Sequence, residues 1–237
     1  MKCFFSENFQ YLSAQRNLSI DDWRTGTGIS KAKITAFLSN KSLPDAGELM
    51  KISTFCNYPL EKLLKENIAT TEKILKSFDF KFLVLDIDGV MTDAGIIYTE
   101  TGDEIKKFNA RDGMAIIRLV NAGYHVGFLS SGFKEEIIKR RAKVLGVQKV
   151  YIGTWKKLEA LEDWCKELKI SMKNVAYIGD DLNDIPVIEK VGLSACPADA
   201  IAEVKDKVNV ILSLRGGCGC VREFGDKFLS DYSKSPF

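Results

Sequence analysis

Two aspartates lie one residue apart, directly after a short apolar run in the middle of the chain. Residues 82–85 are apolar and predict a buried strand, and Asp86, Ile87 and Asp88 follow it. Because side chains two positions apart on an extended chain point to the same side, the two carboxylates are expected to lie close together. Such a pair shares a cation or holds a proton. One carboxylate can also attack phosphorus while the other transfers the leaving-group proton, although Asp and Gly after a strand equally fit an ordinary turn.

The elements that must position this pair follow from the alternating segments after residue 81. Strands are predicted at residues 82–85, 124–129, 149–152, 175–178, 193–195 and 208–211, with helices at 113–122, 134–145, 156–168, 184–190 and 200–204. Strands that alternate with helices predict an α/β fold with a doubly wound parallel sheet. Ligands of such sheets bind outside the carboxyl ends of the strands. The polar turns after the first four strands are therefore expected to share one rim of the sheet.

Those turns carry the other candidate residues for chemistry. They are Ser130, Ser131 and Gly132 after the second strand, Lys157 after the third, and Asp180, Asp181 and Asp184 after the fourth. Asp86, Asp88 and Asp180 are expected to surround one Mg²⁺, because hard oxygen ligands favour this ion.

The remaining groups at the rim suit a phosphate. Ser130 is expected to hold a phosphate oxygen, and Lys157 to neutralise the charge of the phosphoryl group and the nucleophile. Asp181 and Asp184 would orient these groups. Each residue alone also fits a plainer interpretation, such as a turn serine, a solvated lysine or an acidic helix cap. The order of all four turns at successive strand ends favours the joint interpretation.

An insertion separates the paired aspartates from the first helix. Residues 95–98 and 104–108 predict a β-hairpin with Gly102 in its turn. Because the hairpin interrupts the first connection from strand to helix, it is expected to overhang the rim of the sheet.

The first 69 residues predict a separate helical domain, followed by a joint at residues 70–80 and the α/β domain at 81–237. Helices are expected near residues 9–16, 20–25, 31–38, 46–55 and 60–64. Ser19 and Ser30 are candidate N-caps of the second and third helices.

This helical segment resembles the DNA-binding helix-turn-helix module of the Cro and phage-repressor type. The turn Gly28-Ile29-Ser30 and the runs LPDAGELMKIS and YPLEKLLKENI carry the resemblance. It implies that the second helix of the pair enters the major groove. Since residues 25–44 contain no acidic side chain, nucleic acid is a candidate partner of residues 19–41. Arg24 departs from that family, which has a small residue at this position.

Composition sets limits on the function. The chain has 237 residues, a net charge of +2 and 28% charged residues, so charge alone predicts no nucleic-acid or membrane partner. No apolar run is long enough to span a bilayer. The six cysteines form no Cys-x-x-Cys pair, and together with the absence of a signal sequence they favour a reducing cytoplasm.

Four runs of the second domain carry a specific resemblance: LDIDGVMTDAGIIY, FNARDGMAI, GDDLNDIPVIEKVGLS and GGCGCVREF. Over about residues 81–229, the chain resembles the haloacid dehalogenase phosphatases. Within them it is similar to the 3-deoxy-D-manno-octulosonate 8-phosphate phosphatase subfamily and to phosphatases of nine-carbon keto-sugar acid 9-phosphates.

The resemblance implies roles for five residues. Asp86 is the nucleophile that forms an aspartyl-phosphate, and Asp88 is the general acid and then the base for water. Asp180 completes the Mg²⁺ site with the Asp86 carboxylate and the backbone carbonyl of Asp88. Ser130 and Lys157 hold the phosphate. The family members lack a large cap domain and form tetramers, in which the hairpin and a neighbouring subunit help to close the site.

The chain departs from the subfamily at two substrate positions. The run from Ser130 to Phe133 reads Ser-Ser-Gly-Phe instead of Thr-Gly-Arg, so Ser131 is an alternative to Ser130 and an arginine is absent. Cys218 stands where the subfamily has an arginine in Gly-Gly-Arg-Gly. The remaining candidates for binding the substrate, including its carboxylate, are Arg111, Arg141, Arg222, Ser131 and Gly132.

The sequence therefore predicts a Mg²⁺-dependent cytoplasmic phosphatase. Its substrate would be a small-molecule sugar phosphate, namely a phosphorylated 3-deoxy keto-sugar acid, and its assembly a homotetramer. The alternative is a DNA-binding regulator whose phosphatase-like domain senses a sugar phosphate.

Overall fold

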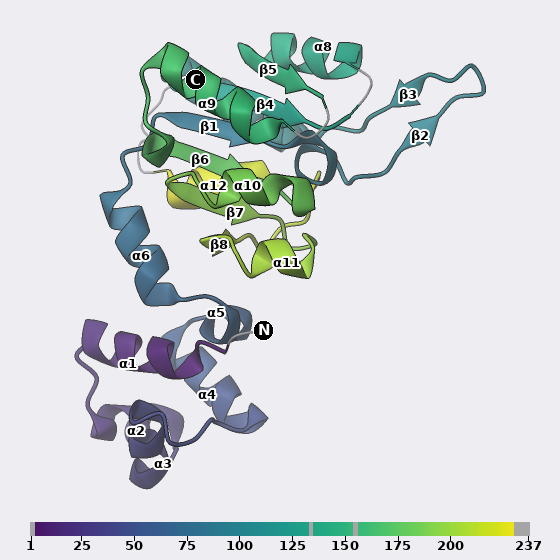
Figure 1. Ribbon diagram of the computed structural model, residues 1–237. Helices are drawn as coiled ribbons and strands as arrows, with labels where there is room; N and C mark the ends of the chain where they lie inside the picture. Colours follow the sequence, from purple (N-terminus) through teal and green to yellow (C-terminus); the bar gives the residue numbers. More distant parts are fainter. Residues whose placement is uncertain (1–2, 133–134, 154–155, 230–237) are drawn as a thin grey trace. The chain divides into compact units, whose positions relative to one another are not determined.

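A computed structural model describes residues 3–132, 135–153 and 156–229 (Figure 1). It contains two compact units, residues 1–76 and 77–237. Helix α6 (Ile68–Ser77) occupies most of the segment that was expected to join the two domains. The domain limits at residues 69 and 81 stay predictions. Phe133, which was expected to replace a substrate-binding arginine, lies outside the described residues.

The N-terminal unit is helical. Before α6 its helices are α1 (Phe5–Gln15), α2 (Ile20–Thr27), α3 (Lys31–Leu38), α4 (Ala46–Cys56) and α5 (Leu60–Lys65). Its core is rich in aromatic side chains, among which Phe9 packs on Trp23 with ring centroids 4.3 Å apart. Ser19 and Ser30 accept hydrogen bonds from the backbone N–H groups of Asp22 and Lys33, which confirms both predicted N-caps.

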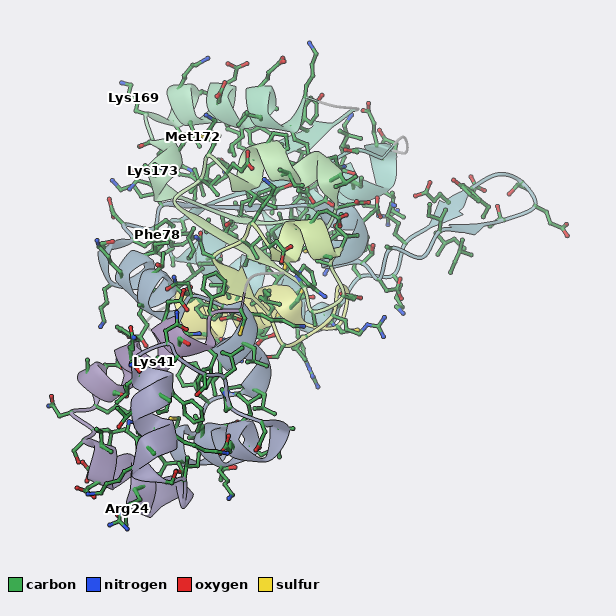
Figure 2. The ribbon with its side chains drawn as sticks, turned by 60° about the horizontal axis from the view of Figure 1, so that its bottom comes forward. Arg24, Lys41, Phe78, Lys169, Met172 and Lys173 are labelled. Atoms are coloured by element: carbon green, nitrogen blue, oxygen red, sulfur yellow. The ribbon has the colours of Figure 1, made fainter. Side chains whose placement is uncertain are left out.

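Gly26 lies where α2 approaches a neighbouring aromatic ring. A Cβ atom at this position would meet Phe55 Cε2 at 2.1 Å, so the absence of a side chain permits the contact. Arg24, the residue at which the sequence departs from the Cro type, instead points outward and pairs with Asp21 at 3.3 Å (Figure 2). The close approach in α2 is therefore made at residue 26.

The second unit is built on a six-stranded parallel sheet in the order β5-β4-β1-β6-β7-β8. The strands are β1 (Phe82–Leu85), β4 (His125–Ser130), β5 (Lys149–Ile152), β6 (Val175–Ile178), β7 (Leu193–Cys196) and β8 (Val210–Ile211). This arrangement confirms the predicted α/β fold class. Leu85 lies opposite Phe128 of β4 and Ile178 of β6. The register therefore brings the carboxyl ends of the three central strands to the same rim.

Helices cover both faces of this sheet. They are α7 (Ala110–Asn121), α8 (Glu135–Leu145), α9 (Lys157–Leu168), α10 (Ile185–Ile188), α11 (Ala202–Lys205) and α12 (Cys220–Phe228). In Figure 1, α9 and α10 lie in front of the sheet and α12 lies behind it. Phe82 and Val84 of β1 share a core cluster with Leu161 of α9 and Val187 of α10. Because side chains alternate along a strand, position 86 faces the same side as residues 82 and 84.

Three shorter elements lie at or near the rim. A turn with one π-type hydrogen bond, η1 (Ile87–Met91), follows Asp86, and β2 (Ile97–Tyr98) pairs with β3 (Glu104–Ile105) as the predicted hairpin. The third, the 3₁₀ turn η3 (Leu182–Asp184), lies between β6 and α10. A further short turn, η2 (Met172–Asn174), precedes β6 and therefore lies at the amino end of that strand, away from the rim. No helix in the described part of the chain is long and apolar enough to cross a membrane.

Candidate active site

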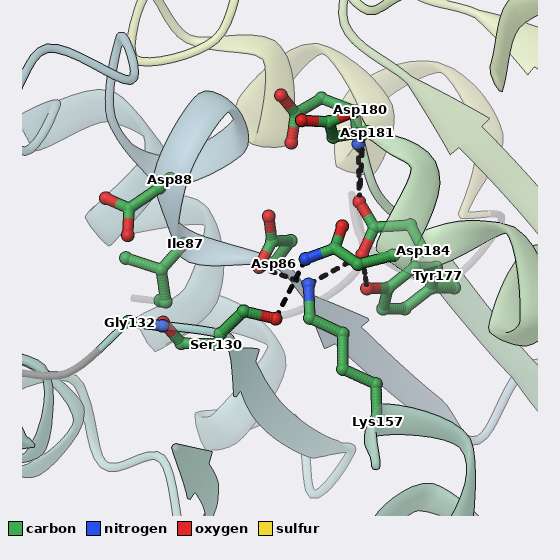
Figure 3. A network of polar contacts seen from close by, with 12 residues as sticks. Asp86, Ile87, Asp88, Ser130, Gly132, Lys157, Tyr177, Asp180, Asp181 and Asp184 are labelled. Atoms are coloured by element: carbon green, nitrogen blue, oxygen red, sulfur yellow. Dashed lines mark hydrogen bonds and ion pairs between the residues drawn. The ribbon is translucent and has the colours of Figure 1, made fainter. Parts of the chain in front are cut away.

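The carboxyl rim of the sheet gathers several of the predicted residues in one place (Figure 3). Asp86 directly follows β1, Ser130 ends β4, and Asp180 follows β6 after one glycine. Lys157 opens α9, and Asp184 closes η3. The side chains of Asp86, Lys157 and Asp184 are almost completely buried, so their charges interact with little screening by water.

Lys157 links the ends of two strands. Its Nζ lies 2.8 Å from Asp86 Oδ1 and 2.7 Å from Asp184 Oδ1. Burial alone lowers the pKa of Lys157, but the charges and hydrogen bonds of these two carboxylates raise it to about 12. The ammonium group therefore stays charged and fixes one oxygen of Asp86.

Asp184 organises the turn after β6. Its Oδ1 accepts hydrogen bonds from Lys157 and, at 2.6 Å, from the hydroxyl of Tyr177. Its Oδ2 accepts from the backbone N–H of Asp180 at 2.8 Å and of Asp181 at 3.2 Å. Both oxygens of Asp184 are thus occupied by protein donors, and the backbone that carries Asp180 is held in place.

A divalent cation fits between Asp86 and Asp180. Single ligand atoms of Asp86, Asp180 and Asp184 all lie within 4.8 Å of one another. Asp180 Oδ1 is buried and has no hydrogen-bond partner among the described residues. Burial and the neighbouring carboxylates raise the pKa of Asp86 to about 7 and that of Asp180 to about 9. A cation would relieve the repulsion between these carboxylates. Asp86 and Asp180 have oxygens available to bind it, whereas both oxygens of Asp184 already accept hydrogen bonds from the protein.

The loop after Asp86 is shaped to admit the Asp180 side chain. Gly89 has a φ of +91°, a conformation that other residues rarely adopt. A Cβ atom on Gly89 would come within 2.0 Å of Asp180 Oδ2. Gly216 packs equally closely, since its Cβ would meet the carbonyl oxygen of Gly89 at 2.0 Å. The glycines of the run GGCG therefore support the loop that bears the paired aspartates.

The Asp88 carboxylate is set apart from the buried cluster (Figure 3). Its Oδ1 accepts a hydrogen bond from Lys106 Nζ at 2.6 Å and from Thr92 Oγ1 at 3.3 Å. Lys106 also pairs with Glu104 at 2.7 Å. Burial lowers the pKa of Lys106, but the hydrogen bonds and charges of Asp88 and Glu104 raise it above its ordinary value. Lys106 thus holds one carboxylate oxygen of Asp88, and the backbone carbonyl of Asp88 stays a predicted metal ligand.

A cavity of about 340 Å³ opens over these groups. It is lined by Asp86, Asp88, Ala94, Ile96, Tyr98, Glu104, Lys106, Ser131, Gly132, Asp180, Asp181 and Asn183. Acidic groups and the hairpin thus enclose the space next to Asp86. Four of the lining residues belong to the predicted hairpin segments 95–98 and 104–108, as the insertion of the hairpin into the first connection predicted. They are Ile96, Tyr98, Glu104 and Lys106.

The two neighbouring serines have different surroundings. Ser130 is fully buried, and its Oγ accepts a hydrogen bond from the backbone N–H of Gly132 at 3.1 Å. Ser131 lines the cavity, and its Oγ accepts from Asn183 Nδ2 at 2.8 Å. Of the two hydroxyls, that of Ser131 is therefore better placed to meet a ligand beside Asp86.

The structure describes all three predicted substrate-binding arginines, and none of them lines this cavity. Arg111 is exposed, and the guanidinium of Arg141 lies 5.2 Å from the ring centroid of Phe108. Arg222 Nε pairs with Asp226 at 2.7 Å. A role of these residues in binding the substrate remains a prediction.

Sequence reasoning missed Tyr177, Lys106 and Asn183. Tyr177 lies within β6, where an aromatic side chain predicts only core packing. Lys106 belongs to a hairpin whose pairing depends on a turn, so its direction could not be read from the sequence. Asn183 lies between two aspartates of a run already assigned to the site, and this position in the sequence could have identified it as a residue of the site.

A comparison with protein families matches residues 61–215 to the haloacid dehalogenase-like hydrolases. Among individual proteins, the chain is similar to the 3-deoxy-D-manno-octulosonate 8-phosphate phosphatase KdsC of Escherichia coli strain K12. The two are 38% identical over 160 residues, which are 68% of this chain and 85% of that protein.

Solved structures give the same picture. The 3-deoxy-D-manno-octulosonate 8-phosphate phosphatase of Yersinia pestis superposes with a TM-score of 0.65 at 36% identity, over 68% of this chain and 86% of that one. The corresponding phosphatase of Moraxella catarrhalis superposes with a TM-score of 0.66 at 28% identity, over 70% and 96%. The latter was solved with a magnesium ion, a phosphate ion and a KDO molecule. The family match at residues 61–215 spans all six strands of the parallel sheet.

Proposed function

Because this chain belongs to the haloacid dehalogenase-like hydrolases, we propose that it is a phosphatase that transfers a phosphoryl group first to Asp86 and then to water. The observation that carries the proposal is the buried pairing of Asp86 with Lys157 beside Asp180, at the rim where ligands of such sheets bind.

In the first step, an oxygen of Asp86 attacks phosphorus, and the bond from phosphorus to the substrate oxygen breaks. Asp88 gives its proton to that leaving oxygen. In the second step, Asp88 takes a proton from water, whose oxygen attacks the aspartyl-phosphate and releases inorganic phosphate and free Asp86. Lys157 holds one oxygen of Asp86, so that the other oxygen can face the phosphorus.

We assign the metal ligands to Asp86, Asp180 and the backbone carbonyl of Asp88. A bound Mg²⁺ would neutralise charge on the phosphoryl oxygens as it builds up. Asp184 and Asp181 are assigned no direct contact with the metal and orient the groups that bind it. Asp184 does so by accepting a hydrogen bond from the backbone N–H of Asp180.

The names of the relatives support a substrate class, since both refer to 3-deoxy-D-manno-octulosonate 8-phosphate. We propose a phosphorylated 3-deoxy keto-sugar acid of eight or nine carbons. The test is a phosphate-release screen with the Mg²⁺-loaded protein on the octulosonate 8-phosphate, a nonulosonate 9-phosphate and a hexose phosphate. The keto-sugar acid phosphates are expected to give the higher kcat/KM, and a preference for the hexose phosphate would overturn the substrate class.

The hydroxyl that binds the phosphate is expected to be that of Ser131. Replacing Ser131 with alanine should lower kcat/KM by about 10- to 100-fold, because one preorganised hydrogen bond to the phosphoryl group is lost. The matched variant Ser130→Ala should lose less than about fivefold, since the Ser130 hydroxyl accepts a hydrogen bond from the backbone N–H of Gly132 in its own turn and does not line the cavity, as far as the described residues show. Steady-state kinetics of both variants decide the assignment. A larger loss in Ser130→Ala would reverse it.

We further propose that the enzyme assembles as a homotetramer through the hairpin. Ile96, Ile97, Tyr98 and Ile105 are each about half exposed or more, although they are large and apolar. Exposed apolar side chains gathered on one hairpin favour a protein contact. In such an assembly a neighbouring subunit could bring Arg111, Arg141 or Arg222 near the carboxylate of the substrate.

A second function, nucleic-acid binding by residues 19–41, has one supporting feature. Helices α2 and α3 follow each other after a short turn, in which Gly28 has the left-handed conformation, and this succession supports the resemblance to a helix-turn-helix. Two lysines of α3, however, form ion pairs with acidic residues of the same helical unit. Lys31 pairs with Asp21 at 2.8 Å and Lys33 with Glu48 at 2.5 Å. Binding to DNA would have to compete with these ion pairs, so the function as a regulator stays a prediction.

A further inference from the structure

Among the described residues, Lys106 is the one basic residue of the hairpin that forms an ion pair with Asp88. It directly follows β3, yet only 4% of its side chain is exposed. Its Nζ lies between Asp88 Oδ1, at 2.6 Å, and Glu104 Oε1, at 2.7 Å. Burying an ammonium group costs free energy unless it is paired. Both carboxylates are therefore needed to keep this lysine inside the cavity.

The next residue shows that this placement is particular to Lys106. Lys107 also pairs with an aspartate of the loop after β1, since its Nζ lies 2.6 Å from Asp93 Oδ2. However, 72% of the Lys107 side chain is exposed, and it does not line the cavity beside Asp86. An exposed ion pair of this kind contributes little. Lys107 is therefore a matched control for Lys106: both lysines pair with an aspartate, but only Lys106 lies inside the cavity.

The ion pair divides the two oxygens of Asp88 between different tasks. Both hydrogen bonds that the described residues make to this carboxylate end on Oδ1, from Lys106 and from Thr92. Oδ2 is left to face a ligand in the cavity, which Asp88 lines. A side chain without these two donors could rotate about χ1 and χ2. A proton donor must lie within hydrogen-bond reach of the oxygen that it protonates, so this rotation matters.

We propose that Lys106 is a positioning residue of the reaction: by holding Asp88 Oδ1 it directs Asp88 Oδ2 at the oxygen of the leaving group. The inference rests on the proposed function, because it requires Asp88 to transfer the proton. The hairpin thereby does more than enclose the substrate, since its position determines the geometry of proton transfer.

The test compares two substrates that differ in their need for a proton. In 3-deoxy-D-manno-octulosonate 8-phosphate the leaving group is the sugar oxygen, which is a poor leaving group and must be protonated. In p-nitrophenyl phosphate, by contrast, p-nitrophenolate leaves as a stable anion. The ratio kcat/KM reports the first phosphoryl transfer. Lys106→Met is expected to lower it by about 100-fold for the sugar phosphate and by less than about fivefold for p-nitrophenyl phosphate. Lys106→Arg should recover most of the activity, and Lys107→Met should match the wild type.

Three results would count against this role. Equal losses of Lys106→Met on both substrates would show a structural effect only, and unchanged kcat/KM would show that Asp88 needs no such partner. If Lys106→Met does not fold, Lys106→Arg takes its place in the test. A Lys106→Arg variant with a normal melting temperature but equal losses on both substrates would then contradict the role. Asp88→Asn separates the two proposals. If it leaves sugar phosphate hydrolysis intact, or if the wild type hydrolyses neither substrate, the proposed function itself fails.

Discussion

Replacing Asp86 with asparagine is expected to lower phosphate release by at least about 10⁴-fold, because an amide cannot take up the phosphoryl group. Asparagine has the same shape, and its carbonyl oxygen can still accept the hydrogen bond that Lys157 now gives to Asp86 Oδ1. The loss should therefore appear in kcat with an intact fold. It is measured as inorganic phosphate released from the keto-sugar acid phosphate in the presence of Mg²⁺.

Two further measurements distinguish lost chemistry from lost structure. Without metal, the melting temperature of Asp86→Asn at neutral pH should equal or exceed that of the wild type. The reason is that burial and the charge of Asp184 already raise the pKa of Asp86 to about 7, so the ionised side chain is unfavourable there. Asp93→Asn is the matched control, since Asp93 lies in the same loop but is exposed and pairs with Lys107. Activity of Asp86→Asn above about 1% of the wild type would disprove the role of Asp86 as the nucleophile.

The rim could be predicted from sequence because parallel strands obey a simple rule. Polar residues or a glycine directly follow or end β1, β4, β5 and β6, and right-handed crossovers bring these ends to one edge. Apolar runs of four to six residues located the strands, so Asp86, Ser130 and Asp180 were correctly expected at one edge. The same rule identified the hairpin as an insertion over that edge.

The direction of individual side chains could not be predicted in this way. Asp184 was expected only to orient other groups, but its four hydrogen bonds depend on Tyr177, whose hydroxyl emerges from the core of the sheet. Ser130 is the last residue of β4 and Ser131 the first residue after it, and the local turn determines which of the two hydroxyls faces the cavity. Helix α12 was not predicted, because the glycine-rich run before it predicts a turn but does not indicate which element follows the turn.

Lys106 shows the physical limit most clearly. From the sequence, Lys106 and Lys107 are equivalent neighbours on a predicted strand, and a charged pair usually belongs to a solvated surface. Only the pairing of Ile97 with Ile105 fixes which of the two turns inward. Contacts between segments that are distant in sequence therefore decided the electrostatics of the site, and such contacts are not encoded in local patterns.

Removing the metal is expected to destabilise the protein more strongly at high pH than at low pH. Burial and the charges of Asp86 and Asp184 raise the pKa of Asp180 to about 9, far above its value in the unfolded chain. Between these two values the folded, metal-free protein binds more protons than the unfolded chain, so its stability falls as the pH rises toward 9. A cation takes the place of the protons and reverses this trend.

The increase in melting temperature on adding Mg²⁺ should accordingly grow between about pH 6 and about pH 9, because fewer protons compete for Asp86 and Asp180. Each displaced proton changes the apparent affinity by up to tenfold per pH unit, which corresponds to about 1.4 kcal/mol of added stability when the metal concentration is held constant. Calorimetric melts with Mg²⁺ and with a chelator measure the difference. Asp180→Asn should lose the response and nearly all turnover, whereas Asp163→Asn, which removes an exposed aspartate of α9, should retain both. If the Mg²⁺ effect is the same at both pH values, or persists in Asp180→Asn, the cation does not bind between these carboxylates.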